Sequence, residues 1–219
     1  MRSLTLPLLF STLLLAGCGV LPHGKSERNP RPEPAAATSA FSSTSARQCL
    51  ADLGDAGVRY QALPNREFGG GCRTVDTVQL LDIGVPTTNL GALTCPLAAG
   101  FSAWARYAVQ PAARRMLGSD VVKIETMGTY ACRNINGAGS GKLSQHALAN
   151  AVDVSAFVLR DGRRVSVERG WNGDPREQAF LRTLHASACR RFGTVLGPDY
   201  NSAHYNHLHF DMSGNGYCR

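Results

Sequence analysis

The sequence lacks several short motifs that would place it in common functional classes. No Cys-x-x-Cys pair occurs, which argues against a zinc site built from cysteines. There is no Gly-x-Ser-x-Gly elbow, and the glycine-rich stretch 137–141 is not followed by Lys-Ser or Lys-Thr, so a serine hydrolase and a phosphate-binding loop are both disfavoured. The formal net charge is +7, but no Lys/Arg block, RNA-reading aromatic motif or helix-turn-helix pattern accompanies it. We therefore expect no nucleic-acid partner.

The N-terminus has the pattern of a bacterial export signal. Arg2 supplies one positive charge before an apolar run that is too short for a permanent membrane-spanning helix. The run ends in Leu15-Ala16-Gly17-Cys18, which resembles the lipobox of bacterial lipoproteins, where the cysteine is lipidated and becomes the mature N-terminus. We expect a signal peptide over 1–18 and a lipid anchor at Cys18, the alternative being an ordinary signal with an incidental cysteine. Gly19 is not the aspartate of an inner-membrane retention signal, which favours the outer membrane.

The remainder divides into a linker and one folded domain. Residues 19–45 are rich in Pro, Ala, Ser and Thr and show no apolar period, so they predict a disordered tether. From 46 to 219, apolar runs alternate with glycine-containing turns over a length sufficient for a single core, without internal repeats or a second linker. For an exported protein, the positive charge is consistent with attraction to anionic wall polymers or the membrane surface, or simply with a basic soluble surface.

The cysteines predict disulfide bonds. The chain has seven cysteines, and setting Cys18 aside leaves an even number in an oxidising compartment. Sequence cannot select among the possible pairings, but neighbouring segments favour Cys49 with Cys72, Cys95 with Cys132, and Cys189 with Cys218.

Local patterns predict an α+β fold with a mainly antiparallel sheet and helices on one face. Apolar residues at helical spacing indicate helices over 95–117, with a bend or restart at Pro111, and over 176–192. Alternating or apolar runs indicate strands over 120–126, 151–159, 164–168 and 207–211, with Asp161-Gly162 turning between the second and third.

Five residues with metal-binding chemistry gather in two short segments. Imidazoles and one carboxylate can fill three positions around a tetrahedral zinc ion and leave the fourth open, as in a catalytic site. Small residues between the first histidine and the aspartate let the backbone bring the two together. Single histidines and aspartates usually make ordinary hydrogen bonds, but four of the chain's six histidines lie here: the cluster is His146, Asp153, His204, His207 and His209. His23 and His185 are expected to be incidental.

The strand pattern explains how these side chains could meet. In a strand, His207 and His209 project to one side, while Leu208 and Phe210 project to the opposite, apolar layer. Asp153 lies in an apolar strand, where an unpaired carboxylate would be costly and a cation is one of the few partners that offsets the cost. The residues alone therefore indicate a zinc hydrolase.

The motifs resemble known families. Ser144-x-His146, Asp153 and His207-x-His209 are similar to the signature of zinc peptidases that include lysostaphin-type enzymes, D-alanyl-D-alanine carboxypeptidases and the hedgehog signalling domain. The spacing of His204, His207 and His209 also resembles that of penicillin-insensitive murein endopeptidase. Over most of the folded region, the chain resembles the bacterial extensin-like C-terminal domain family in three segments: 130–133, 143–146 and 196–201.

This resemblance implies roles for individual residues. His146, Asp153 and His209 would bind Zn²⁺, and His207 or His204 would act as general base, with His207 favoured. Several relatives have a glutamate base a few residues before the last ligand, where this chain has Tyr205 and Asn206, so the base assignment stays open.

Two further residues have possible substrate roles. Arg133 would bind a substrate carboxylate or stabilise the oxyanion, an exposed surface arginine being the alternative. Ser144 would bind substrate or orient the site, an ordinary turn serine being the alternative. Residues 137–141 are expected to form a flexible lip beside the site.

The function that follows is hydrolysis of peptidoglycan stem peptides or cross-links by a zinc-dependent, lipid-anchored periplasmic peptidase of the D,D-carboxypeptidase or endopeptidase type. A non-catalytic envelope lipoprotein that keeps the fold and only binds peptidoglycan or a partner is the alternative, supported by the missing glutamate. In a third interpretation, the disulfides stabilise a scaffold and the histidines form a hydrogen-bonded cluster.

Overall fold

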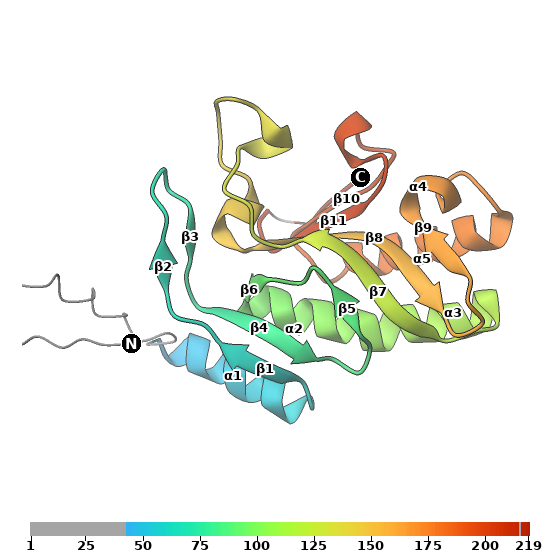
Figure 1. Ribbon diagram of the computed structural model, residues 1–219, viewed down its shortest axis with the longest axis horizontal. Helices are drawn as coiled ribbons and strands as arrows, with labels where there is room; N and C mark the ends of the chain where they lie inside the picture. The colour runs from blue at the N-terminus through green and yellow to red at the C-terminus, as the bar shows by residue number, and fades with distance from the viewer. Residues whose placement is uncertain (1–42, 215) are drawn as a thin grey trace, which may run out of the picture. The chain divides into compact units, whose positions relative to one another are not determined.

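A computed structural model describes residues 43–214 and 216–219 (Figure 1). The predicted signal peptide, Cys18 and residues 19–42 of the predicted tether lie outside this part. Among the helices of the described part, none combines the length and apolarity needed to cross a membrane.

The architecture is α+β, built on a seven-stranded mixed sheet. The strand order is β12-β10-β11-β8-β7-β5, with β9 pairing to β8. The β5–β7 and β10–β12 pairs are parallel and the other pairs are antiparallel. The strands are β5 Thr87–Thr88, β7 Val121–Gly128, β8 Ala151–Leu159, β9 Arg164–Ser166, β10 Thr194–Leu196, β11 Leu208–Asp211 and β12 Tyr217–Cys218.

Shorter strands come from the N-terminal part of the domain. Three of them form an antiparallel sheet in the order β1-β4-β6, and two form the β2–β3 hairpin, which in Figure 1 projects beyond that sheet. Their bounds are β1 Arg59–Ala62, β2 Arg66–Glu67, β3 Arg73–Thr74, β4 Thr77–Asp82 and β6 Ala92–Thr94.

Some of the helices begin where a side chain caps the first turn. Asp174 accepts hydrogen bonds from the Arg176 and Glu177 amides, and Pro175 occupies the first position of α5. Ser43 caps α1 in the same way. The helices are α1 Thr44–Asp55, α2 Cys95–Trp104, α3 Gln110–Leu117, α4 Val167–Gly170 and α5 Pro175–Cys189, with 3₁₀ turns η2 Ile135–Gly137, η3 Gln145–Leu148 and η4 Ser202–His204.

The predicted restart at Pro111 takes the form of a π-helical segment, η1 Ala105–Val109, between α2 and α3. The Gln110 amide donates to the Ala105 carbonyl five residues back. Proline has no amide hydrogen to donate, and the wider turn just before Pro111 absorbs this break in the α-helical pattern.

The core lies between one face of the large sheet and helices α2, α3 and α5. Side chains at 152 and 154 of β8 belong to it, as do those at 157 and 159 after a bulge at Ser155. Trp104 of α2 packs edge-on against Phe210 of β11 at 4.9 Å, and its indole N–H donates to the Leu184 carbonyl of α5. The alternate residues of β8 and β11 therefore project from the opposite face, as the sequence predicted for β11.

Three disulfide bonds form, but two of the predicted pairings were wrong. Cys189 pairs with Cys218, as predicted. The other bonds are Cys49–Cys95 and Cys72–Cys132, because α1 packs on the start of α2 and the β2–β3 hairpin lies against the segment after β7. Adjacency in sequence did not predict adjacency in space.

The strand predicted over 164–168 is also shorter than expected. It ends at Ser166, whose hydroxyl accepts a hydrogen bond from the Arg169 amide and so caps α4. Val167 and Glu168 are therefore helical.

Candidate metal centre

The pairing of β8 with β11 places Asp153 directly opposite His209. Their neighbours on both strands enter the core, so these two side chains project from the other face. On its second side Asp153 pairs with Gly128, whose φ of 124° requires glycine and which places no side chain beside the carboxylate.

His146 reaches the same point from the 3₁₀ turn η3. Ser144 begins the turn, and its hydroxyl accepts a hydrogen bond from the His146 amide, so Ser144 orients the backbone that carries this imidazole. Ala149 then adopts a left-handed conformation, with φ of 51°, and directs the chain into β8. The compact turn expected from the small residues between His146 and Asp153 is present.

The three side chains converge to metal-ligand distances. Asp153 Oδ1 lies 2.8 Å from His209 Nδ1, Asp153 Oδ2 lies 3.1 Å from His146 Nε2, and the two ring nitrogens are 3.2 Å apart. Tetrahedral ligands at zinc–nitrogen and zinc–oxygen bond lengths would be about 3.3 Å from one another. All three side chains are buried. The spacing is therefore close to what a metal ion would require.

The hydrogen bonds of the outer ring nitrogens orient both imidazoles so that their inward nitrogens can coordinate a metal. His146 Nδ1 donates to the Thr129 carbonyl at 2.9 Å, and His209 Nε2 donates to Asp211 Oδ2 at 3.1 Å. When both rings are neutral, the inward nitrogens carry lone pairs that face the Asp153 carboxylate. Such a group of acceptors favours a cation at its centre, and an oxygen partner on the outer nitrogen is the usual support of a metal-binding histidine.

The protonation of Asp153 and His209 is also consistent with a metal ion between them. Burial alone would raise the pKa of Asp153, but hydrogen bonds from His146 and His209 outweigh it and hold that pKa below its usual range. Burial opposes the charged form of His209, yet its bonds to Asp153 and Asp211 raise its pKa to about 9. A metal ion bound at this centre would displace that proton, because a ligating imidazole must be deprotonated.

His204 and His207 stand beside this centre without joining it. His207 Nε2 lies 3.6 Å from Asp153 Oδ1, and its Nδ1 donates to Asn206 Oδ1 at 2.9 Å. His204 Nδ1 donates to Asn201 Oδ1 at 2.7 Å. Burial lowers the pKa of both histidines, that of His204 to about 4, so both are neutral near pH 7 and have a free Nε2. Either can accept a proton.

These groups form part of the wall of a cleft of about 550 Å³. Arg133 also lines it, with its guanidinium 3.8 Å from Asp153 Oδ2 and its side chain about 40% exposed. Of the predicted lip 137–141, Gly137 lines the same cleft, and so do its neighbours Ile135 and Asn136. Tyr200 and Tyr217 line it too. The structure thus brings every predicted site residue of the folded domain together, while Cys18 lies outside the described residues.

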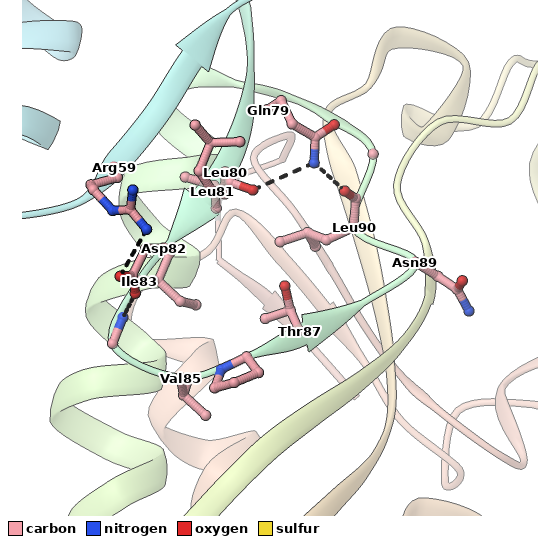
Figure 2. A pocket seen from close by; sticks show the side chains of 13 residues that line it. Arg59, Gln79, Leu80, Leu81, Asp82, Ile83, Val85, Thr87, Asn89 and Leu90 are labelled. Carbon is pink, nitrogen blue, oxygen red and sulfur yellow. Dashed lines mark hydrogen bonds and ion pairs between the residues drawn. The ribbon is translucent and has the colours of Figure 1, made fainter.

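A larger hollow lies elsewhere on the described surface and has less reactive side chains. It measures about 1070 Å³ and is lined mainly by β4, β5 and their connection (Figure 2). Figure 2 shows Arg59 paired with Asp82 and the Gln79 amide donating to the carbonyls of Leu80 and Leu90. Because neither histidine nor cysteine lines this hollow, the smaller cleft is the candidate site.

Sequence reasoning missed the residues that orient the imidazoles. Asp211, Asn201, Asn206 and the Thr129 carbonyl each accept one imidazole N–H. A signal was present for three of them, since each polar side chain lies within three positions of its histidine. The Thr129 carbonyl had no such signal, because any residue could supply it.

Comparison with known proteins gives one match. The family model described as "Extensin-like protein C-terminus" matches residues 47–219. No match was found among curated proteins or among solved structures.

Proposed function

We propose that this chain, which belongs to the extensin-like protein C-terminus family, is a zinc-dependent peptidase of the bacterial cell envelope that hydrolyses peptidoglycan stem peptides or cross-links. The observation that carries the proposal is the convergence of His146, Asp153 and His209 beside a cleft. Both of these histidines line the cleft, together with two further neutral imidazoles. Three protein ligands with an open fourth position are typical of catalytic rather than structural zinc. The proposal includes a fold like that of the hedgehog and D-alanyl-D-alanine peptidase group.

The residues of the cleft have complementary tasks in amide hydrolysis. Zinc, when bound, would polarise the substrate carbonyl and lower the pKa of water. His207 would take the proton of the attacking water at Nε2 and deliver it to the leaving nitrogen, so that a C–O bond forms as the C–N bond breaks. Asn206 holds the ring in the tautomer that this requires. Arg133 would offset negative charge on the substrate.

The cellular location is part of the same proposal. The predicted lipid anchor at Cys18 and the tether would hold the domain near the wall, in the periplasm and preferably at the outer membrane. Peptidoglycan is then the abundant amide-containing polymer within reach, and the anchor is the expected membrane contact.

The test uses the full chain, solubilised in detergent and loaded with one equivalent of zinc. Muropeptide cleavage, followed by chromatography and mass spectrometry, should fall about 100-fold or more in His146→Ala and in whichever of His207→Ala and His204→Ala removes the base. His185→Ala is the matched control, because this histidine lies outside the cleft and donates to the Arg219 carbonyl. Absence of bound zinc on metal analysis would contradict the proposal.

The non-catalytic alternative has its own signature. It would show binding to isolated sacculi that His207→Ala leaves unchanged, with no released product.

A further inference from the structure

A second hollow lies beside the centre, next to the β2–β3 hairpin. It measures about 450 Å³, and we call it the hairpin hollow. Thr129 connects it to the cleft, because this residue lines the hollow and its carbonyl accepts the N–H of His146, which lines the cleft. In Figure 1, the hairpin, the 130–150 segment and the 3₁₀ turn η4 project to the same side of the sheets. The lining residues are Leu63, Pro64, Arg66, Phe68, Thr74, Asn89, Gly91, Ala92, Gly128, Thr129 and Tyr130.

One residue that lines the hollow has an unpaired polar group. Thr129 is 2% exposed, and its Oγ1 is one of two buried side-chain atoms in the described part of the chain without a hydrogen-bond partner. A Cβ added at Gly91 would lie 3.0 Å from this oxygen, so the hydroxyl lies against Gly91, and both residues line the hollow. A buried hydroxyl without a partner is uncommon in native proteins and indicates a position where a bound group would supply one.

The walls combine aromatic surface with a free positive charge. Phe68 is 49% exposed and packs against Tyr130 with ring centroids 5.1 Å apart. Arg66 is exposed and has no ion pair within residues 43–214 and 216–219. The Cys72–Cys132 bond ties the hairpin to the segment that carries Arg133, so this wall has a set position relative to the cleft. A ligand with an apolar body and a carboxylate would complement these groups.

The hollow also extends away from the centre. Asn89 and Gly91 line both the hairpin hollow and the larger hollow of Figure 2. A substrate with a single residue beyond the cleaved bond would leave this surface unused, whereas a branched substrate would follow it.

We propose that the hairpin hollow binds the second peptide of a cross-link, through its free carboxylate at Arg66 and its apolar portion at Phe68 and Tyr130. This inference rests on the proposed peptidase function and makes the enzyme an endopeptidase selective for cross-linked over single stem peptides.

The experiment compares a cross-linked muropeptide with a single stem peptide that has the same cleaved bond. In Arg66→Ala, kcat/KM for the cross-linked substrate should fall about tenfold, mainly through KM, because a charge-assisted contact is lost. Cleavage of the single peptide should not change. Arg73→Ala is the matched control, because Arg73 is exposed on the other strand of the same hairpin and does not line this hollow. Equal loss on both substrates, or no loss on either, would overturn the inference.

Binding to the metal-free protein separates this inference from the proposed function. Calorimetry should show the cross-linked peptide binding more tightly than the single one, with the difference removed in Arg66→Ala even if the wild type cleaves neither. Equal binding of the two peptides, or competition by a peptide-free disaccharide, would overturn it. Cleavage of both substrates without any preference would leave the peptidase proposal standing and reject this one.

Thr129→Val provides a further check, because it replaces an unpaired buried hydroxyl by a methyl group of similar shape. The melting temperature should stay the same or rise, while the cross-linked peptide should bind severalfold more weakly. A fall in stability with unchanged binding would show that the hydroxyl serves the fold instead.

Discussion

The cluster of His146, Asp153 and His209 and the cluster of His185, Cys189 and Cys218 satisfy the same distance criterion, with potential ligand atoms within 4.8 Å of one another. The two clusters differ in the bonds that their potential ligand atoms already make. The two cysteines are joined to each other, and His185 Nε2 donates to the Arg219 carbonyl. In the first cluster, oxygen acceptors occupy the outer nitrogens, and the inner nitrogens face the Asp153 carboxylate.

Proximity of metal-binding residue types is therefore a weak criterion when taken alone. What separates the two clusters is the partner of each second atom: a disulfide removes thiolates from metal binding, whereas a carboxylate or carbonyl behind an imidazole directs its lone pair inward.

The largest difference should follow from removing the disulfide of the second cluster. Replacing Cys189 and Cys218 by serine should lower the free energy of unfolding by about 2–4 kcal/mol, because the bond no longer constrains the unfolded chain. Zinc stoichiometry of the folded fraction should stay at one. Chemical denaturation and metal analysis check the two parts, and a lower stoichiometry would show that the second cluster contributes to metal binding.

A smaller effect is expected from the partner of His209. Asp211→Asn removes the charged acceptor behind this ligand and should weaken zinc binding about 10–100-fold, measured by competition with a chromophoric chelator. Asp199→Asn is the matched control, since Asp199 pairs with Arg182 and bonds to Trp171, outside the cleft. Equal zinc affinity in the two variants would remove Asp211 from the centre.

The smallest effect is expected in the pH dependence of the free energy of unfolding of the metal-free protein. The pKa of His209 is raised from 6.5 to about 9, so protonation stabilises the fold fully below pH 6.5, and this contribution is lost as pH rises through 9. Between pH 7 and pH 8 the free energy of unfolding should fall by about 1 kcal/mol from this group. His209→Gln should abolish that slope in denaturation series, and an unchanged slope would assign it to another group.

Much of the fold was predictable because its patterns are local. Alternation over 207–211 correctly placed Leu208 and Phe210 in the core and His209 on the other face. The apolar run 151–159 is the strand β8. The residues that converge in the candidate centre were selected by type and spacing.

The remainder depends on contacts between segments that are distant in sequence. Cys72 meets Cys132 across 60 residues, and no local pattern encodes that approach. The strands of the β2–β3 hairpin have two residues each, too few to show an alternation, so Arg66 and Phe68 could not be placed beside the centre. Asp211 was assigned to a strand but not to His209, because its role depends on side-chain geometry.

If the proposed metal ion binds, the direct pairing of Asp153 with His209 makes its binding a test of correct assembly. A slip of one residue between β8 and β11 would turn one of the two side chains into the core and separate the ligands. His146 must also arrive from its own turn. A chain that has mispaired these strands could not form the proposed centre. Metal loading would then report that the sheet has formed in its native register, and it would follow folding rather than direct it.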